Sequence, residues 1–127
     1  MDTTMKWLKL ILVGGCGLFT GQLSCAQESL ISKYTQATLL ENWALSHCLA
    51  LVYKDDTVRK DAEASASAYL EYGKQPIEFY HQIDVILNKY INSEYGGSIS
   101  SEFNTMKCID FIHGVELKKL IDRSIEP

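Results

Sequence analysis

The cysteines constrain this chain most, because they divide into two kinds. Four occur among 127 residues. Cys16 and Cys25 lie in an N-terminal segment that has the pattern of a removable leader, and Cys48 and Cys108 are the two cysteines of the remaining body. A secretory leader delivers the body to an oxidising compartment, where two cysteines most simply form one disulfide. The sequence therefore predicts a single bridge between Cys48 and Cys108.

The leader has the three regions of a signal peptide. Lys6 and Lys9 give it a positive start, residues 10–21 form an uncharged apolar run, and residues 24–26 (Ser-Cys-Ala) place small side chains where signal peptidase reads them. We expect cleavage after residue 26, which leaves residues 27–127 as one small mature domain exported to an oxidising compartment.

Two other fates of the leader stay open. Cys16 follows Val13-Gly14-Gly15, a degenerate form of the motif that directs lipid attachment. The apolar run could instead remain as a membrane anchor, although it is too short to span a bilayer comfortably. We favour full cleavage, with no stable membrane insertion of the mature domain.

The charge balance limits the partners of the body. The whole chain carries 12 Lys and Arg against 16 Asp and Glu, a formal net charge of −4. Removing Asp2, Lys6 and Lys9 with the leader makes the body more negative still. Because phosphate contacts need clustered cations, nucleic acid and anionic lipid are excluded as main partners. A basic protein partner is compatible with this charge.

The apolar residues of the body recur with a helical period almost throughout, and no strand-like alternation or internal repeat interrupts them. We therefore predict one small all-α domain of four to five helices with one disulfide. The expected helices run from a capping box at Thr38 to about Tyr53, from Val58 to Tyr72, from Pro76 to about Ser93, from about Glu102 to His113, and from Val115 to about Ser124.

The same spacing predicts which side chains face inward. On the first helix these are Ala37, Leu40, Ala44, Cys48 and Leu51. On the fourth they are Phe103, Met106, Ile109 and Ile112, with Cys108 beside them. We expect both cysteines to occupy the core.

Two segments depart from a simple amphipathic helix. The third helix has apolar residues on more than one face, which indicates either the central helix of the domain or a subunit interface. The segment from Tyr95 to Ser101 (YGGSISS) has no helical period and two adjacent glycines, so it reads as an exposed loop. From the residues alone, this loop is either a flexible turn or a surface that contacts another protein.

No arrangement of residues indicates an enzyme. His47 and Cys48 are neighbours on a helix and point about 100° apart, so they cannot act together as base and nucleophile. Glu78 and His81 have the spacing of one di-iron helix pair, but such a site needs that pair twice. His47, His81 and His113 lack zinc-site spacing, and there is no CxxC, phosphate-binding glycine loop or nucleophile elbow. We therefore predict no catalytic, metal or cofactor site.

Four segments together resemble a known family. They are residues 42–50 (NWALSHCLA), 61–71 (DAEASASAYLE), 76–78 (PIE) and 104–110 (NTMKCID). Any one of them alone would be weak, but their joint occurrence in this order, within about Tyr34 to Asp122, is similar to the type VI secretion amidase immunity proteins that protect against the fourth amidase effector family.

The resemblance implies a periplasmic, all-helical protein, usually a homodimer, that binds and blocks a papain-like peptidoglycan amidase delivered by neighbouring cells. It also implies the Cys48–Cys108 disulfide, and it assigns effector contact to the third helix and the loop after it. The loop residues expected to contact the effector are Tyr95, Gly96, Gly97, Ser98, Ile99 and Ser100.

The mechanism that we expect is occlusion without turnover or cofactor. A disulfide-tied scaffold presents the loop to the catalytic cleft, where the paired glycines let the backbone approach closely. The alternative is a periplasmic chaperone or adaptor whose apolar third helix holds a client segment. Weak binding to many unfolded clients would favour that alternative, whereas one saturable partner would favour immunity.

Overall fold

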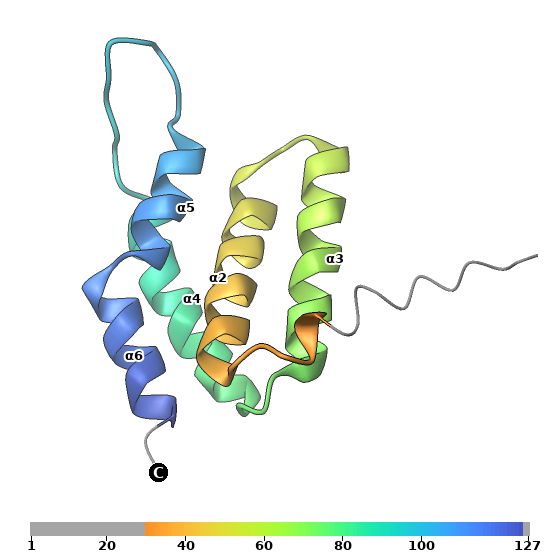
Figure 1. The fold of residues 1–127 in the computed structure, drawn as a ribbon. Coiled ribbons are helices and arrows are strands. Elements are labelled where there is room, and N and C mark those ends of the chain that lie inside the picture. The colour runs from red at the N-terminus through yellow and green to blue at the C-terminus, as the bar shows by residue number, and fades with distance from the viewer. Residues whose placement is uncertain (1–29, 126–127) are drawn as a thin grey trace, which may run out of the picture.

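The computed structural model describes residues 30–125. Five complete helices lie in this part of the chain (Figure 1): α2 (Gln36–Val52), α3 (Asp56–Tyr72), α4 (Ile77–Ile91), α5 (Asn104–Ile112) and α6 (Val115–Ile125). No strand occurs among residues 30–125, and none of their helices combines the length and apolarity needed to cross a bilayer. The all-α prediction is confirmed, whereas the leader, residues 1–26, lies outside the described residues.

The central helix is α2, not α4. It packs against α3 on one side and against α4, α5 and α6 on the other (Figure 1). Side chains on more than one side of it are buried, those of Leu40 and Cys48 on one face and those of Leu39 and Ala50 on another. Of the two predicted places for the third helix, the centre of the domain is therefore wrong.

The core forms where α2 meets the C-terminal three helices. Its largest inaccessible side chains are Leu40, Ile83, Leu87, Phe111, Leu117 and Ile121. Burying a side chain of this size contributes about 1.5–3 kcal/mol, so these residues supply much of the stability. The helix α3 joins through small side chains, and the burial of Ala62 and Ala66 lets it run close beside α2 as predicted.

The start of α2 differs from the prediction. Thr35, not Thr38, is the N-cap, and its Oγ1 accepts the backbone N–H of Thr38 at 3.1 Å. The helix therefore begins at Gln36, whereas an N-cap at Thr38 would start it at Leu39, about one turn later. At the other end Val52 is buried while Leu51 is 54% exposed, so the inward position predicted for Leu51 is also wrong.

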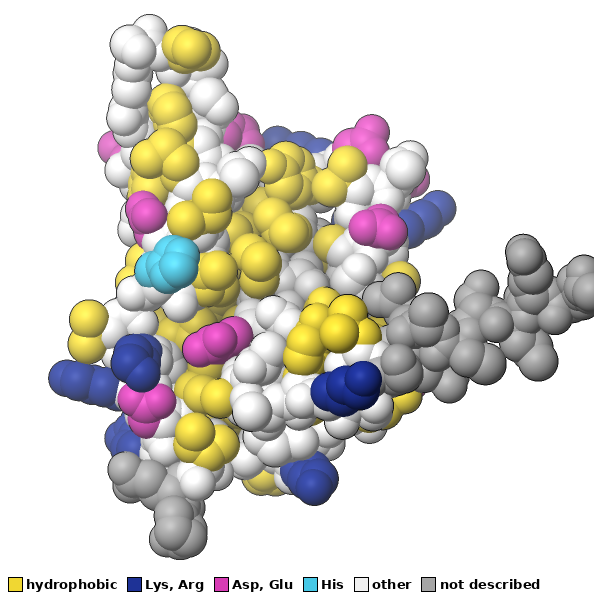
Figure 2. All heavy atoms as spheres, viewed as in Figure 1, with side chains coloured by type: hydrophobic (Ala, Val, Ile, Leu, Met, Phe, Trp, Pro, Cys, Tyr) yellow, Lys and Arg dark blue, Asp and Glu magenta, His cyan; other side chains and the backbone are white. Residues whose placement is uncertain are grey.

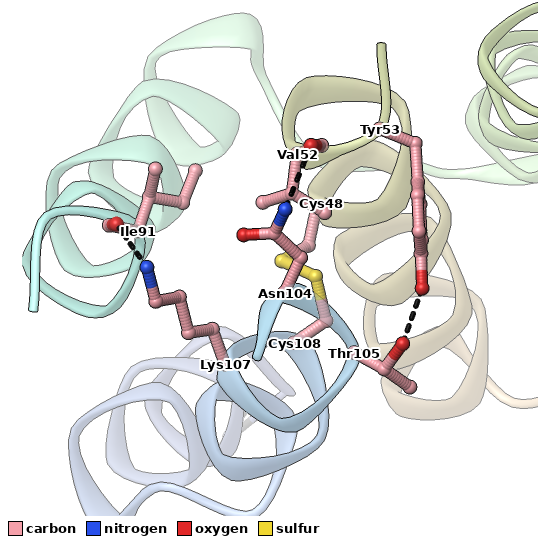
Figure 3. The surroundings of a disulfide bond; sticks show 8 residues. All are labelled: Cys48, Val52, Tyr53, Ile91, Asn104, Thr105, Lys107 and Cys108. Atoms are coloured by element: carbon pink, nitrogen blue, oxygen red, sulfur yellow. Dashed lines mark hydrogen bonds between the residues drawn. A yellow bond between two sulfur atoms is a disulfide. The ribbon is translucent and has the colours of Figure 1, made fainter. Parts of the chain in front are cut away.

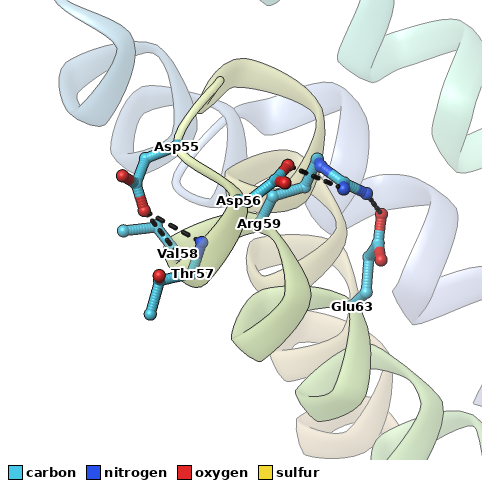
Figure 4. Close-up of polar contacts among 6 residues, drawn as sticks. All are labelled: Asp55, Asp56, Thr57, Val58, Arg59 and Glu63. Atoms are coloured by element: carbon cyan, nitrogen blue, oxygen red, sulfur yellow. Dashed lines mark hydrogen bonds and ion pairs between the residues drawn. The ribbon is translucent and has the colours of Figure 1, made fainter.

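The start of α3 follows the sequence signal. Asp55 is the N-cap, and its Oδ1 accepts the backbone N–H groups of Thr57 and Val58, each at 3.0 Å (Figure 4). Such caps contribute about 1 kcal/mol. In the following turns Arg59 bridges Asp56 and Glu63, at 3.0 and 2.7 Å (Figure 4). These ion pairs are exposed and contribute less than about 1 kcal/mol each.

The buried face of α5 is rotated from the predicted one. Cys108 and Phe111 are inaccessible, whereas Met106 and Ile109 are 46% and 45% exposed. The prediction failed because a strict three-residue spacing does not stay on one face of an α-helix: over the nine residues from Phe103 to Ile112 it drifts by about half a turn.

Candidate functional site

The disulfide joins the two helices that support the projecting end of the molecule. Cys48 on α2 and Cys108 on α5 have Cα atoms 5.7 Å apart, and both side chains are inaccessible to solvent (Figure 3). The predicted pairing is confirmed. Because the Cys48 sulfur is bonded, it is not available as a nucleophile.

The first turn of α5 is also held by polar contacts to the ends of α2 and α4. Asn104 Nδ2 donates to the carbonyl of Val52 at 3.2 Å, and Lys107 Nζ donates to the carbonyl of Ile91 at 3.2 Å. A third contact joins the hydroxyl groups of Tyr53 and Thr105 (Figure 3). Each carbonyl belongs to the last turn of a helix, where no partner within the helix remains for it. The disulfide and these bonds therefore tie three helix ends together.

A long connection, residues 92–103, leaves this base and projects beyond the helices (Figure 1). We call residues 95–101 the contact loop. Its residues 96–101 are exposed, as predicted, and carry no charge, while Glu94 and Glu102 flank it. Ile99 is 77% exposed, more than any other large hydrophobic residue between residues 30 and 125. Figure 2 shows hydrophobic atoms at the tip of the projection.

Tyr95 differs from the rest of the contact loop. It is half-buried, and its Oη donates a hydrogen bond of 2.8 Å to Oδ2 of Asp110 on α5. The ammonium of Lys107 lies 5.9 Å from the centre of its ring, within the range of a cation–π contact. The hydrogen bond to Asp110 is the main reason why the pKa of Tyr95 is raised above its usual value.

Phe103 closes the other side of the connection. It is the N-cap of α5 and has φ 54° and ψ 35°, the left-handed region, which no other non-glycine residue in the described part of the chain occupies. Its backbone N–H donates to Ser101 Oγ at 3.3 Å. Its ring packs on Gly97, because a Cβ placed there would lie 2.8 Å from the ring's Cζ. A Cβ at Gly96 would meet nothing within 4 Å.

The other candidate residues are spread over the fold. Glu78 and His81 lie exposed on α4, and His113 is the C-cap of α5. His47 Nε2 lies 2.9 Å from Asp84 Oδ1 and links α2 to α4. Within residues 30–125 no three His, Cys, Asp or Glu side chains gather in a way that could hold a metal ion.

Sequence reasoning missed three residues that shape the contact loop: Phe103, Lys107 and Asp110. The apolar spacing predicts Phe103 on the inner face of the fourth helix, and it gives Lys107 and Asp110 no role beyond their place in that helix. The only sequence feature that pointed to such contacts was that the loop directly precedes α5. That feature does not identify which side chains of α5 contact the loop.

The comparisons with known proteins agree with this geometry. The family of Tai4, type VI secretion system (T6SS) amidase immunity proteins, matches residues 38–121. This chain belongs to that family. The matched range includes both cysteines of the disulfide and the entire connection between α4 and α5, so the Tai4 match spans the whole candidate site.

Solved structures show the same relationship. A chain from the effector–immunity system Tae4/Tai4 of Salmonella typhimurium is 66% identical, with 77% of this chain and 97% of that one covered and a TM-score of 0.73. A chain from the Tae4–Tai4 complex of Enterobacter cloacae is 25% identical, with 72% and 93% covered and a TM-score of 0.65.

A third structure pairs the Salmonella typhimurium effector Tae4 with the Enterobacter cloacae immunity protein Tai4. Its matching chain is 25% identical, with coverage of 72% and 94% and a TM-score of 0.64. No curated protein matches the chain. The prediction of an amidase immunity protein is confirmed at the level of the family.

Proposed function

We propose that this chain is a periplasmic immunity protein that inserts its contact loop into the catalytic cleft of a type VI secreted peptidoglycan amidase and denies substrate access. The observation that carries the proposal is a projecting, uncharged loop with an exposed Ile99, mounted on a disulfide-tied base. The solved relatives come from a Tae4/Tai4 effector–immunity system and from a Tae4–Tai4 complex, which supports a Tae4-type amidase as the partner.

The chemistry of the contact loop suits a narrow cleft. Residues 96–101 bring no charge that would lose its hydration on entry, and Ile99 supplies apolar surface whose burial favours binding. Gly96 has no neighbour at its Cβ position, so its backbone can approach the partner closely. The predicted contact of Tyr95 to Ser100 with the amidase remains a proposal, and these grounds support it for residues 96–100. In this proposal the inhibitor performs no turnover and needs no cofactor.

Export follows from where the substrate lies. A peptidoglycan amidase acts in the periplasm, so its inhibitor must be present there. We expect the exported protein to begin at Gln27 without lipid, which intact-mass spectrometry of a periplasmic extract would show. An acylated Cys16, or a mass that includes the leader, would contradict this processing.

The chaperone alternative has less support. It needs a free apolar face on α4, but Phe79, Tyr80, Ile83 and Leu87 of that helix are buried in the domain's own core. The exposed apolar residues of α4 are Ile77 and Val85. Two such residues do not make the continuous apolar face that a client segment needs. In line with the sequence prediction, we propose a homodimer through this helix.

A protection assay tests the proposed function. Cells that make a Tae4-type amidase in the periplasm should survive with the parent chain and lyse when residues 98–100 are deleted. The deletion removes exposed residues outside any helix, so circular dichroism and thermal melting should stay unchanged. Full protection by this well-folded deletion would reject the contact loop as the inhibitory surface.

A pair of substitutions sharpens the assay. Ile99→Asp places a charge at the loop tip, whereas Ile125→Asp places one at an exposed position in the last turn of α6, 46% accessible. We expect Ile99→Asp to weaken binding to the amidase by at least about tenfold and Ile125→Asp to leave it unchanged. Equal affinities for the two variants would place the contact elsewhere.

A further inference from the structure

An exposed connection of this length without secondary structure is ordinarily mobile. Here two contacts cross its base, one from each end. They use residues that are neither at the tip nor in the core, and neither contact is needed to build the helices. We call them the Tyr95 brace and the Phe103 brace.

The Tyr95 brace fixes the outgoing side of the connection to α5. Its hydroxyl donates to Asp110 at 2.8 Å, and Lys107 lies over its ring while donating to the carbonyl of Ile91. Lys107 therefore connects the end of α4, the start of the loop and α5. The hydroxyl group and the ring of Tyr95 therefore both have partners within the chain, Asp110 and Lys107.

The Phe103 brace fixes the returning side. The left-handed backbone of Phe103 is unfavourable for an aromatic residue, and such strain persists only where the surroundings impose it. In this conformation the Phe103 ring contacts Gly97 on the other side of the connection. The ring can lie this close because Gly97 has no Cβ atom.

We propose that Tyr95, Phe103 and Asp110 are positioning residues that hold the contact loop in its projecting conformation before the amidase arrives. This inference rests on the proposed function and deepens it. A loop that is already ordered loses less conformational freedom on binding, so the braces raise affinity without touching the partner. Tyr95 accordingly acts through the loop, and the direct contacts belong to residues 96–100.

Tyr95→Phe tests this role, because it removes the hydroxyl and keeps the ring. The matched control is Tyr69→Phe, a half-buried tyrosine on α3 whose ring lies 6.5 Å from that of Tyr34. Backbone ¹⁵N order parameters of residues 96–102 are measured in the free protein, because no backbone N–H among these residues donates a hydrogen bond that would slow its exchange with solvent. Binding to a purified Tae4-type amidase is then measured by surface plasmon resonance.

We expect Tyr95→Phe to lower the order parameters of the loop and to weaken binding roughly two- to tenfold, the effect of one hydrogen bond, with an unchanged melting temperature. Tyr69→Phe should alter neither the order parameters nor the affinity. Asp110→Asn, which keeps an acceptor oxygen, should behave like the parent, whereas Asp110→Ala should behave like Tyr95→Phe.

Two results would overturn the inference. Loop order parameters in Tyr95→Phe equal to those of the parent would show that the brace orders nothing. Weaker binding with unchanged order parameters would show that Tyr95 contacts the amidase directly. If the parent itself does not bind the amidase, the proposed function fails, but the order parameters of the free protein still decide whether the braces order the loop.

Discussion

Two adjacent glycines in the contact loop have different surroundings. A Cβ at Gly97 would lie 2.8 Å from the Phe103 ring, closer than Cβ atoms approach other groups, whereas Gly96 has open space. We predict that Gly97→Ala displaces the ring or the loop and lowers the backbone ¹⁵N order parameters of residues 96–102. Gly96→Ala should leave these order parameters unchanged in the free protein.

The same pair separates internal packing from contact with the partner. Gly96→Ala should weaken amidase binding if its backbone lies against the cleft, even though the free loop is undisturbed. A Gly97→Ala variant with parental order parameters would contradict the packing of Phe103 on Gly97. Titration calorimetry with the amidase measures both variants.

Tyr95 gives the loop a pH dependence. Its pKa is raised, chiefly by the hydrogen bond to Asp110, so folding favours the neutral phenol. A group with a raised pKa contributes its stabilisation fully below the unfolded value, near 10, and loses it as the pH rises through the folded value. We predict that the brace is intact at neutral pH and is lost in the alkaline range, above the usual pKa of tyrosine.

The carboxylate of Asp110 can be tested directly. Asp110→Ala removes both the acceptor of the hydrogen bond and the negative charge that opposes a tyrosinate, so the pKa of Tyr95 should fall towards its usual value. NMR titration of tyrosine labelled at Cζ resolves this residue among the seven tyrosines of the chain. An unchanged pKa would show that Tyr95 and Asp110 are not paired in solution.

Single residues also show where sequence reasoning reaches its limit. The loop was recognisable from its missing helical period, and its exposure is as expected. Tyr95 and Asp110, however, are 15 positions apart, and no periodic pattern indicates a hydrogen bond between a loop and the outer face of the next helix. The left-handed backbone conformation of Phe103 could not be predicted from the sequence either, because aromatic residues rarely adopt it.

At the level of elements, the disulfide orients α5. The bridge places Cys108 against α2, and Phe111, about one turn further on, then faces the same core. Spacing alone located this helix but assigned Met106 and Ile109 to its inner face. The pairing of the cysteines was predictable from their number and compartment, whereas the rotation that it imposes required the structure.

Removing the disulfide should therefore destabilise the domain and the base of the loop. Cys48 and Cys108 are separated by 60 residues, for which loop-closure entropy gives about 4 kcal/mol. That is a large share of a total of roughly 5–15 kcal/mol. We predict that the double variant Cys48→Ala, Cys108→Ala has a clearly lower melting temperature than the parent.

Reductant supplies the control for this variant. Under strong reducing conditions the parent should lose the stabilisation by the bridge, while the melting temperature of the double variant should not move. Equal melting temperatures of parent and variant without reductant would show that the bridge contributes no stability. Two thiols that react freely in the native parent would show that it does not form.

At the scale of the whole molecule, α4 offers surface for a second copy of the chain. Val85 is 64% exposed and borders a hollow of about 250 Å³ between α4 and α6 that Ile86 and Leu120 also line. We predict a dimer at micromolar concentration by light scattering. Val85→Glu should yield a monomer with an unchanged melting temperature, because this position lies outside the core.

The control places the same charge on another exposed apolar residue. Val58 on α3 is 43% exposed, and Val58→Glu should stay dimeric. A monomer mass for the parent would refute the dimer, and a dimeric Val85→Glu would move its interface away from this part of α4. Immunity by loop occlusion does not depend on the outcome, because the contact loop projects from a single chain.

Occlusion of the catalytic cleft is the central claim, and one rate constant tests it most directly. A small alkylating reagent modifies the catalytic cysteine of a papain-like amidase at a rate that depends on access to the cleft. With one equivalent of the parent chain bound, we predict that this rate falls to near zero, and that Ile99→Asp at the same concentration gives much less protection. A stable one-to-one complex in which the cysteine still reacts as fast as in the free amidase would contradict the account.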